Sequence, residues 1–138
     1  MIVSETIVTH GPNKLFDVTG LLEEAARRVG EGVAAVFSKG STGALAVIPR
    51  GAVEEFEEEL WSLVPVDGWE HPGNAYAHLR STLIGTSLLV PVHEGKPCLP
   101  EGYGVFFVEN QPANARRRKI FVAAFSTRRR SQALRGPP

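Results

Sequence analysis

The order of strand-like and helical segments is the feature that most constrains the fold of this chain. Residues 33–38 are a continuous apolar run of strand length, and residues 2–9 are rich in β-branched side chains; both patterns are typical of strands. Further strand-like stretches cover residues 15–18, 44–48, 87–92, 103–109 and 119–126. Helical periodicity predicts helices over residues 20–29, 53–64 and 75–83. Because the helices are clustered rather than strictly alternating with strands, we expect an α+β fold, a largely antiparallel β-sheet packed with two or three helices.

Length, charge and cysteine content restrict the class of protein. The 138 residues carry a formal net charge of zero, which argues for neither a nucleic-acid nor a membrane partner. Residues 1–126 have the length of a single domain, and residues 127–138, TRRRSQALRGPP, read as a flexible basic tail. The N-terminal residues lack the features of a signal peptide, no run reaches the roughly 20 apolar residues of a membrane span, and Cys98 is the single cysteine. We therefore expect a soluble, cytoplasmic protein.

The stretch HPGNAYAHLR, residues 71–80, is the first candidate for a functional site. His71 precedes a proline and is expected to be extended, while His78 lies on the first turns of the predicted helix that Asn74 would cap. Two imidazoles from a loop and a helix can converge on one zinc ion, but a catalytic zinc takes three protein ligands. His93, at the end of a predicted strand, is a candidate third ligand. The alternative is an ordinary pair of polar side chains.

Two further features suggest anion binding. The loop SKGSTG, residues 38–43, exposes backbone N–H groups that can bind phosphate, although a plain hairpin turn explains it equally well. Residues 116–119 are all basic and lead into the predicted last strand, and residues 128–130 are arginines. These clusters could bind phosphate or RNA, but no nucleic-acid-binding motif accompanies them. Basic residues also protect the edges of sheets.

Several short motifs follow one another in a familiar order. FDVTG at residues 16–20 is similar to a D-[IV]-T motif before a first helix, GVAAVFSKGSTGAL at 32–45 to G-x-x-x-V-F-x-x-H-T-T-A-A-L, and HPGNAYAHL at 71–79 to H-x-x-N-A-x-A-H-L. GTSLLVPVHEGKPCL at 85–99 and VFFVEN at 105–110 continue the series. Over residues 3–125 the chain thereby resembles the YjbQ-like family, small proteins named as secondary thiamine-phosphate synthases.

The resemblance implies a compact α+β subunit within a homotrimer, with histidines in a pocket near the subunit boundary that can hold a divalent metal, zinc or magnesium. It makes His71 and His78 metal ligands and makes His78 and Glu109 catalytic residues. The implied reaction class is a transferase that joins a pyrimidine pyrophosphate to a thiazole phosphate, and it needs cations on the leaving group. Phosphate contacts would come from the side chains of Ser41, Thr42, Asn74, Arg80 and Arg116.

The chain also departs from the family pattern. The family's loop histidine falls on Gly40, which removes one imidazole, and the acidic residue after the next strand is replaced in IPRG at 48–51. The G-x-W-Q motif falls near EGYG at 101–104, and the D-G-P-R-x-R segment is reduced to NQPANARR, where Arg116 or Arg117 would stand in. These losses favour a second hypothesis, a non-catalytic relative that binds a small phosphorylated ligand as a trimer. A third hypothesis is a trimer that binds RNA or a partner through its arginine clusters.

Overall fold

The computed structural model describes residues 2–65 and 74–128. The described strands are β1 Ile2–Thr9, β2 Lys14–Asp17, β3 Gly32–Ser38, β4 Gly43–Pro49, β5 Ser87–His93, β6 Lys96–Pro97, β7 Tyr103–Glu109 and β8 Arg116–Ser126. The described helices are α1 Thr19–Val29, α2 Val53–Leu63 and α3 Ala75–Ile84, with a short 3-10 turn, η1, over Arg50–Ala52. Every predicted strand and helix is present within three residues of its expected bounds, and the predicted α+β class is confirmed.

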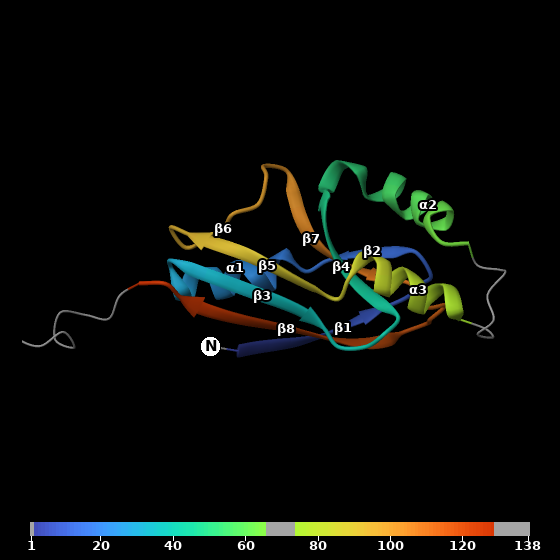
Figure 1. Cartoon of the computed structure of the whole chain (residues 1–138), viewed down its shortest axis with the longest axis horizontal. Helices are drawn as coiled ribbons and strands as arrows, with labels where there is room; N and C mark the ends of the chain where they lie inside the picture. Colours follow the sequence, from blue (N-terminus) through green and yellow to red (C-terminus); the bar gives the residue numbers. More distant parts are fainter. Residues whose placement is uncertain (1, 66–73, 129–138) are drawn as a thin grey trace, which may run out of the picture.

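Two sheets form the frame of the molecule (Figure 1). The five-stranded sheet has the order β1-β8-β3-β5-β6, and the three-stranded sheet has the order β2-β7-β4. All described strand pairs are antiparallel, as the clustering of the helices predicts. Side chains alternate between the two faces of each strand, so every strand of the larger sheet has one face toward the smaller sheet and α1 and one face away from them.

The main core lies between the two sheets and against α1. Val36 of β3, Phe107 of β7 and Val122 of β8 are at most 1% exposed and belong to one apolar cluster. A second cluster connects Leu60 of α2 to the opposite face of the three-stranded sheet. β7 is therefore covered on both sides, and all of its residues after the first are buried. This double covering explains why its sequence reads as a continuous apolar run.

Several strand ends meet at one end of the two layers. Thr9 ends β1 and pairs with Arg116 at the start of β8, while Glu109 ends β7 and pairs with Gly43 at the start of β4. β3 and β4 belong to different sheets, so the segment between them crosses from one layer to the other. The alternative of a plain hairpin turn at residues 38–43 is therefore wrong, because the two strands that flank it do not pair.

The last strand begins earlier than predicted. Residues 116–119 do not lead into β8 but form its first part, because they pair with β1. Strand alternation places Arg116 and Arg118 on the inner face, and Arg117 and Lys119 on the outer face. Arg118 is buried, whereas Arg117 and Lys119 are exposed. The basic cluster of the sequence is thus split between two faces of the sheet.

Some predictions fall wholly or partly outside the described residues. His71 lies outside them, and of the predicted tail only Thr127 and Arg128 are described. Among the helices of the described ranges, none is both long and apolar enough to cross a membrane.

Candidate functional site

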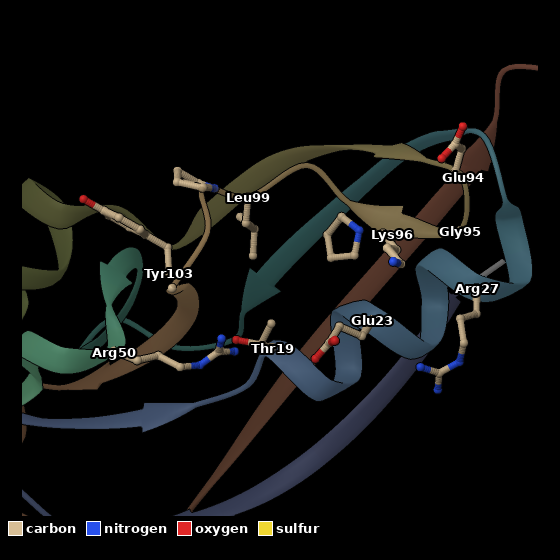
Figure 2. Close-up of a pocket in the computed structure, with 12 residues that line it drawn as sticks. Thr19, Glu23, Arg27, Arg50, Glu94, Gly95, Lys96, Leu99 and Tyr103 are labelled. Atoms are coloured by element: carbon tan, nitrogen blue, oxygen red, sulfur yellow. The ribbon is translucent and has the colours of Figure 1, made fainter.

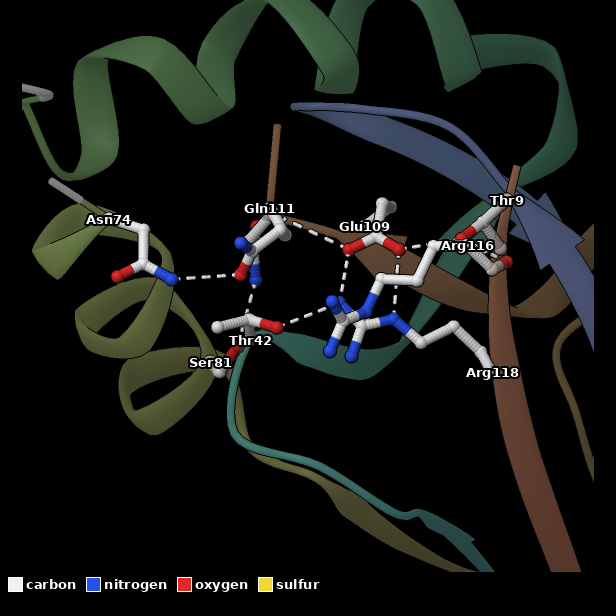
Figure 3. A network of polar contacts seen from close by, with 9 residues as sticks. Thr9, Thr42, Asn74, Ser81, Glu109, Gln111, Arg116 and Arg118 are labelled. Atoms are coloured by element: carbon white, nitrogen blue, oxygen red, sulfur yellow. Dashed lines mark hydrogen bonds and ion pairs between the residues drawn. The ribbon is translucent and has the colours of Figure 1, made fainter. Parts of the chain in front are cut away.

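A buried ion pair between Glu109 and Arg118 occupies the end of the layers where the strands meet (Figure 3). The two side chains are 0% and 3% exposed. Nε of Arg118 donates to Oε1 of Glu109 at 2.8 Å, and Nη2 donates to Oε2. The hydroxyl of Thr9 donates to Oε1 at 2.6 Å, and the backbone N–H of Gln111 donates to Oε2 at 3.2 Å. Both carboxylate oxygens of Glu109 are therefore engaged, and Arg118 is held by a bidentate contact.

The segment between β3 and β4 lies against the same guanidinium. Nη2 of Arg118 also donates to the hydroxyl of Thr42 at 2.8 Å, and the backbone N–H of Asn110 donates to the Thr42 carbonyl at 3.1 Å. Gly40 has a φ of 127°, a conformation that side chains rarely adopt. A Cβ at this position would lie 3.2 Å from Nη1 of Arg118. Nη1 is the one atom of the described residues found within 4 Å of that Cβ, so as far as residues 2–65 and 74–128 are concerned the missing side chain at Gly40 leaves open space directly beside the guanidinium.

One face of α3 borders this cluster. Asn74, at the N-terminal end of α3, donates through Nδ2 to Oε1 of Gln111 at 2.9 Å, and Nδ2 of Asn110 donates to the Ser81 hydroxyl at 3.1 Å. His78 lies between Asn74 and Ser81 at helical spacing, so it belongs to the same face. Asn74 occupies the N-cap position of α3, as predicted, but its side chain makes no cap hydrogen bond and instead contacts Gln111.

Local sequence explains why a charged residue is buried here. Arg118, Ile120, Val122 and Ala124 alternate along the inner face of β8, and the last three belong to the main core. Arg118 lies on the same face as these apolar residues, nearer the start of β8, and its guanidinium lies 5.4 Å from the centre of the Phe107 ring. Arg116, two residues earlier, points in the same direction and is exposed (Figure 3). Burial of the guanidinium is tolerated because Glu109 neutralises it and accepts its hydrogen bonds.

Comparison with known proteins identifies the family. The family model described as "UPF0047 protein YjbQ-like" matches residues 4–127. The chain belongs to the YjbQ-like family. A UPF0047 protein of Archaeoglobus fulgidus is 32% identical over 125 residues, which cover 86% of this chain and 97% of the relative. A UPF0047 protein of Methanothermobacter thermautotrophicus is 35% identical over 120 residues, which cover 80% of this chain and 82% of the relative.

Solved structures show the same fold. The crystal structure of a hypothetical protein from Aeropyrum pernix has a TM-score of 0.79 at 30% identity and covers 91% of this chain and 98% of its own. A YbjQ-like protein from Sulfolobus solfataricus has a TM-score of 0.77 at 26% identity, with the same coverage. These YjbQ-like structures confirm the fold class that the motifs imply.

The described residues do not by themselves form the metal site that the resemblance implies. Within residues 2–65 and 74–128, no group of three or more histidine, cysteine, aspartate or glutamate side chains is placed to hold a metal ion. Glu109 offers no free carboxylate oxygen, and the guanidinium beside it would repel a divalent cation. His93, the candidate third ligand, is exposed and pairs through Nδ1 with Glu31 at 2.9 Å. Metal binding by His71 and His78 stays a prediction, because His71 lies outside the described ranges.

The structure brings some predicted site residues together and separates others. Thr42, Asn74 and Glu109 belong to the network around Arg118, together with the backbone carbonyl of Arg116, which accepts from Thr9 at 3.3 Å. Ser41 is exposed beside Thr42. Arg80, by contrast, is fully buried, and its guanidinium donates to the Val64 carbonyl and to Asn13. Burial lowers the pKa of Arg80, and the nearby Tyr76 offsets this only in part.

Sequence reasoning missed several members of the network, above all Arg118, and with it Thr9, Ser81, Asn110 and Gln111. Two residues of the family's R-x-R pattern are expected on one face of a strand, and the pair that satisfies this spacing is Arg116 and Arg118. The interpretation that Arg116 or Arg117 alone stands in for this pattern did not consider that alternate residues of a strand lie on the same face. Arg118 could have been found from its spacing, because it lies two residues before the first of the apolar residues that alternate along the inner face of β8.

Proposed function

We propose that this YjbQ-like protein binds a small phosphorylated molecule, with the phosphate group in the open space beside Gly40 and against Nη1 of Arg118. The observation that carries the proposal is that Nη1 lacks a hydrogen-bond acceptor among the described residues, unlike the other two nitrogens of the same guanidinium. Nε and Nη2 of Arg118 have acceptors, whereas no acceptor for Nη1 is found within the described part of the chain. A nearly buried guanidinium donor that faces open space is suited to a phosphate oxygen.

The ion pair with Glu109 fixes the direction of this donor. Because Glu109 accepts from Nε and Nη2 along one edge of the guanidinium, Nη1 is directed away from the carboxylate. Such pre-organisation lowers the entropic cost of binding. We therefore assign Glu109 a positioning role, in place of the acid or base role that the resemblance implies, since both of its oxygens already accept hydrogen bonds.

Net positive charge at the site comes from Arg116. Glu109 neutralises Arg118, and a phosphate dianion needs at least one further cation nearby. Arg116 lies on the same face of β8 as Arg118 and is exposed (Figure 3). The hydroxyl of Ser41 and the face of α3 that carries Asn74 and His78 would contact the remainder of the ligand.

A transferase reaction of the thiamine-phosphate synthase type is the finer function that the family resemblance suggests. In this chain His78 is the group we assign to proton transfer in such a reaction, because an imidazole can both accept and donate a proton and His78 lies on the α3 face beside the network. Phosphate binding at Arg118 is common to the enzyme and to the non-catalytic relative, so we propose binding first and the transfer reaction as its extension.

Calorimetric titration with inorganic phosphate and thiamine phosphate tests the binding proposal. Gly40→Ala places a methyl group beside Nη1 and should weaken both ligands by at least about tenfold. Gly85→Ala is the matched control, because Gly85 also has a positive φ, 101°, but a Cβ there would meet nothing within 4 Å. Equal affinities for the wild type and Gly40→Ala, with both variants folded, would refute the proposal.

Metal analysis of the purified protein separates this site from the family's metal pocket. We expect phosphate affinity to be unchanged by a chelator, because the donor is a guanidinium. Stoichiometric zinc in the wild type that is lost in His78→Ala, together with loss of phosphate binding, would show instead that a metal ion carries the ligand.

We also propose that the protein self-associates, as the homotrimer prediction requires, through the outer face of the five-stranded sheet. The register places Phe37 beside Phe121 and Val33 beside Phe125 on that face. Phe125 is 59% exposed and Leu89 of β5 is 74% exposed. Exposed apolar patches of this kind mark contact surfaces between proteins, and within the described residues no helix covers this one.

A further inference from the structure

A cavity of about 640 Å³ lies between α1, β6 and the segment that connects β6 to β7 (Figure 2). None of the residues around Glu109 and Arg118 lines it, so it is separate from the site described above. Its volume is within the range of small-molecule sites. Leu99 lies opposite α1 in Figure 2, and Pro97 adds a second apolar side chain to the lining.

One end of this cavity carries a guanidinium held in place by a second network. Nε of Arg50 donates to Oδ2 of Asp17 at 3.0 Å, and Oδ1 of Asp17 accepts from the backbone N–H and the hydroxyl of Thr19 at 2.9 and 2.5 Å. Burial raises the pKa of Asp17, but the hydrogen bonds from Thr19 and Arg50 outweigh it and the net pKa is lowered. Asp17 therefore stays ionised and keeps Arg50 in position.

The absence of a side chain at Gly104 allows this arrangement. A Cβ at Gly104 would lie 2.8 Å from the Thr19 hydroxyl and 3.1 Å from both Nε and Nη2 of Arg50. The guanidinium thus lies against the backbone of β7. Within the described residues, Nη1 and Nη2 of Arg50 have no acceptor, so these donors are available to a ligand.

The opposite end of the cavity carries a second cation. Lys96 extends from β6 toward α1, and Figure 2 shows its ammonium and the Arg50 guanidinium on opposite sides of Glu23, with Arg27 and Glu94 further along on the Lys96 side. Neither Lys96 nor Glu23 makes an ion pair with any described residue. Arg50 at one end, Lys96 and Arg27 toward the other, an apolar wall and the two carboxylates of Glu23 and Glu94 define the chemistry that this cavity can accept.

We propose that this cavity binds a small organic acid with an anionic group at each end, one on Arg50 and one on Lys96. The ligand's carbon chain lies against Leu99 and Pro97, and a hydroxyl or amino group in its middle donates to Glu23. Arg50 supplies two parallel N–H donors, which suit a carboxylate or phosphate, and Lys96 supplies a point charge. A monoanion of similar size makes only one of the two contacts.

Amide chemical shifts of the full-length protein test this proposal, with succinate as the dianionic probe and butyrate as the monoanionic one. We expect succinate to shift the amides of Gly95 and Gly102 and to bind about tenfold more tightly than butyrate, since a hydrogen bond to a charged group contributes this much. Lys96→Gln, which removes an exposed and unpaired side chain, should reduce succinate affinity to that of butyrate. Arg28→Gln is the control, because Arg28 pairs with Glu24 outside the cavity.

The outcomes distinguish this cavity from the phosphate site. Gly40→Ala should leave the affinity for succinate unchanged, whether or not it weakens the affinity for inorganic phosphate. Equal affinities of succinate and butyrate, or succinate binding that Lys96→Gln does not change, would overturn the proposal. So would succinate shifts confined to residues around Arg118.

Discussion

Replacing Arg118 by methionine is the most direct test of the network that holds the phosphate site. The substitution keeps a long apolar stem but removes the guanidinium from a pair whose side chains are 3% and 0% exposed. Glu109 would then remain buried without its cation. Removal of one partner from a buried ion pair typically costs about 3–5 kcal/mol of stability.

The hydrogen bonds that Glu109 keeps indicate a loss of stability near the lower end of that range. Glu109 keeps the hydroxyl of Thr9 at 2.6 Å and the N–H of Gln111 at 3.2 Å, so part of its hydrogen bonding survives. Thr42 loses one donor. We expect Arg118→Met to lower the free energy of unfolding by about 3 kcal/mol. The double variant Arg118→Met with Glu109→Met should lose only about 1 kcal/mol, because no unpaired charge remains.

Urea denaturation of the wild type, both single variants and the double variant measures these values. Arg117→Met is the control, since Arg117 is exposed on the outer face of the same strand, and it should change stability by no more than about 0.5 kcal/mol. A cost below about 1 kcal/mol for Arg118→Met would refute the reasoning. A double variant whose loss equals the sum of the two single losses would do so as well, because contacting partners are expected to be non-additive.

Three further predictions concern other parts of the molecule. The hydrogen bond that His93 donates to Glu31 raises the pKa of His93 above 6.5, so the contribution of this pair to stability is present below pH 6.5 and is lost as pH rises through the raised pKa. Glu31→Gln should return the pKa of His93 toward its ordinary value in an NMR titration, and an unchanged titration curve would contradict this. Leu89→Asp and Phe125→Asp should each dissociate the oligomer, which light scattering would show as a lower molar mass, whereas Arg28→Gln should leave the molar mass unchanged. A monomeric wild type would disprove the self-association proposal. Arg80→Met should lower the free energy of unfolding by about 3 kcal/mol, because it removes the guanidinium donor from the buried Val64 carbonyl and from Asn13. Inorganic phosphate should still bind to this variant. Loss of phosphate binding in a folded Arg80→Met variant would show instead that Arg80 contacts the phosphate.

Sequence patterns predicted the parts of the fold that depend on local periodicity. The apolar run at residues 33–38 and the alternation at residues 2–9 correspond to β3 and β1, because burial of one face imposes a period on the side chains. Local patterns failed at the start of β8, where the three arginines at residues 116–118 were placed before the strand. A strand that pairs with β1 satisfies its backbone hydrogen bonds whatever its side chains are, so basic residues do not end it.

Motifs located the candidate site but not its chemistry. Asn74, His78 and Glu109 were singled out from their positions in short motifs, and the structure places them on the α3 face and the β7 end that border one cluster. The role of Glu109 was not predictable, because it depends on Arg118 and Thr9, which approach it from two other strands. Arg80 was singled out as a phosphate contact because it is a basic residue beside a histidine motif, and the tertiary structure buries its guanidinium against Val64 and Asn13.

The sequence by itself determined the secondary structure, the α+β class and the family, because these follow from local periodicity and from motifs that are continuous in the chain. Only the tertiary structure decided that Arg118 faces Glu109, that Gly40 opens a space beside it, and that Arg50 and Lys96 face one cavity from different elements. Each of these contacts depends on how separate strands and helices are placed against one another. That placement is set by the burial of the whole core rather than by the residues in contact, so no local pattern carries it.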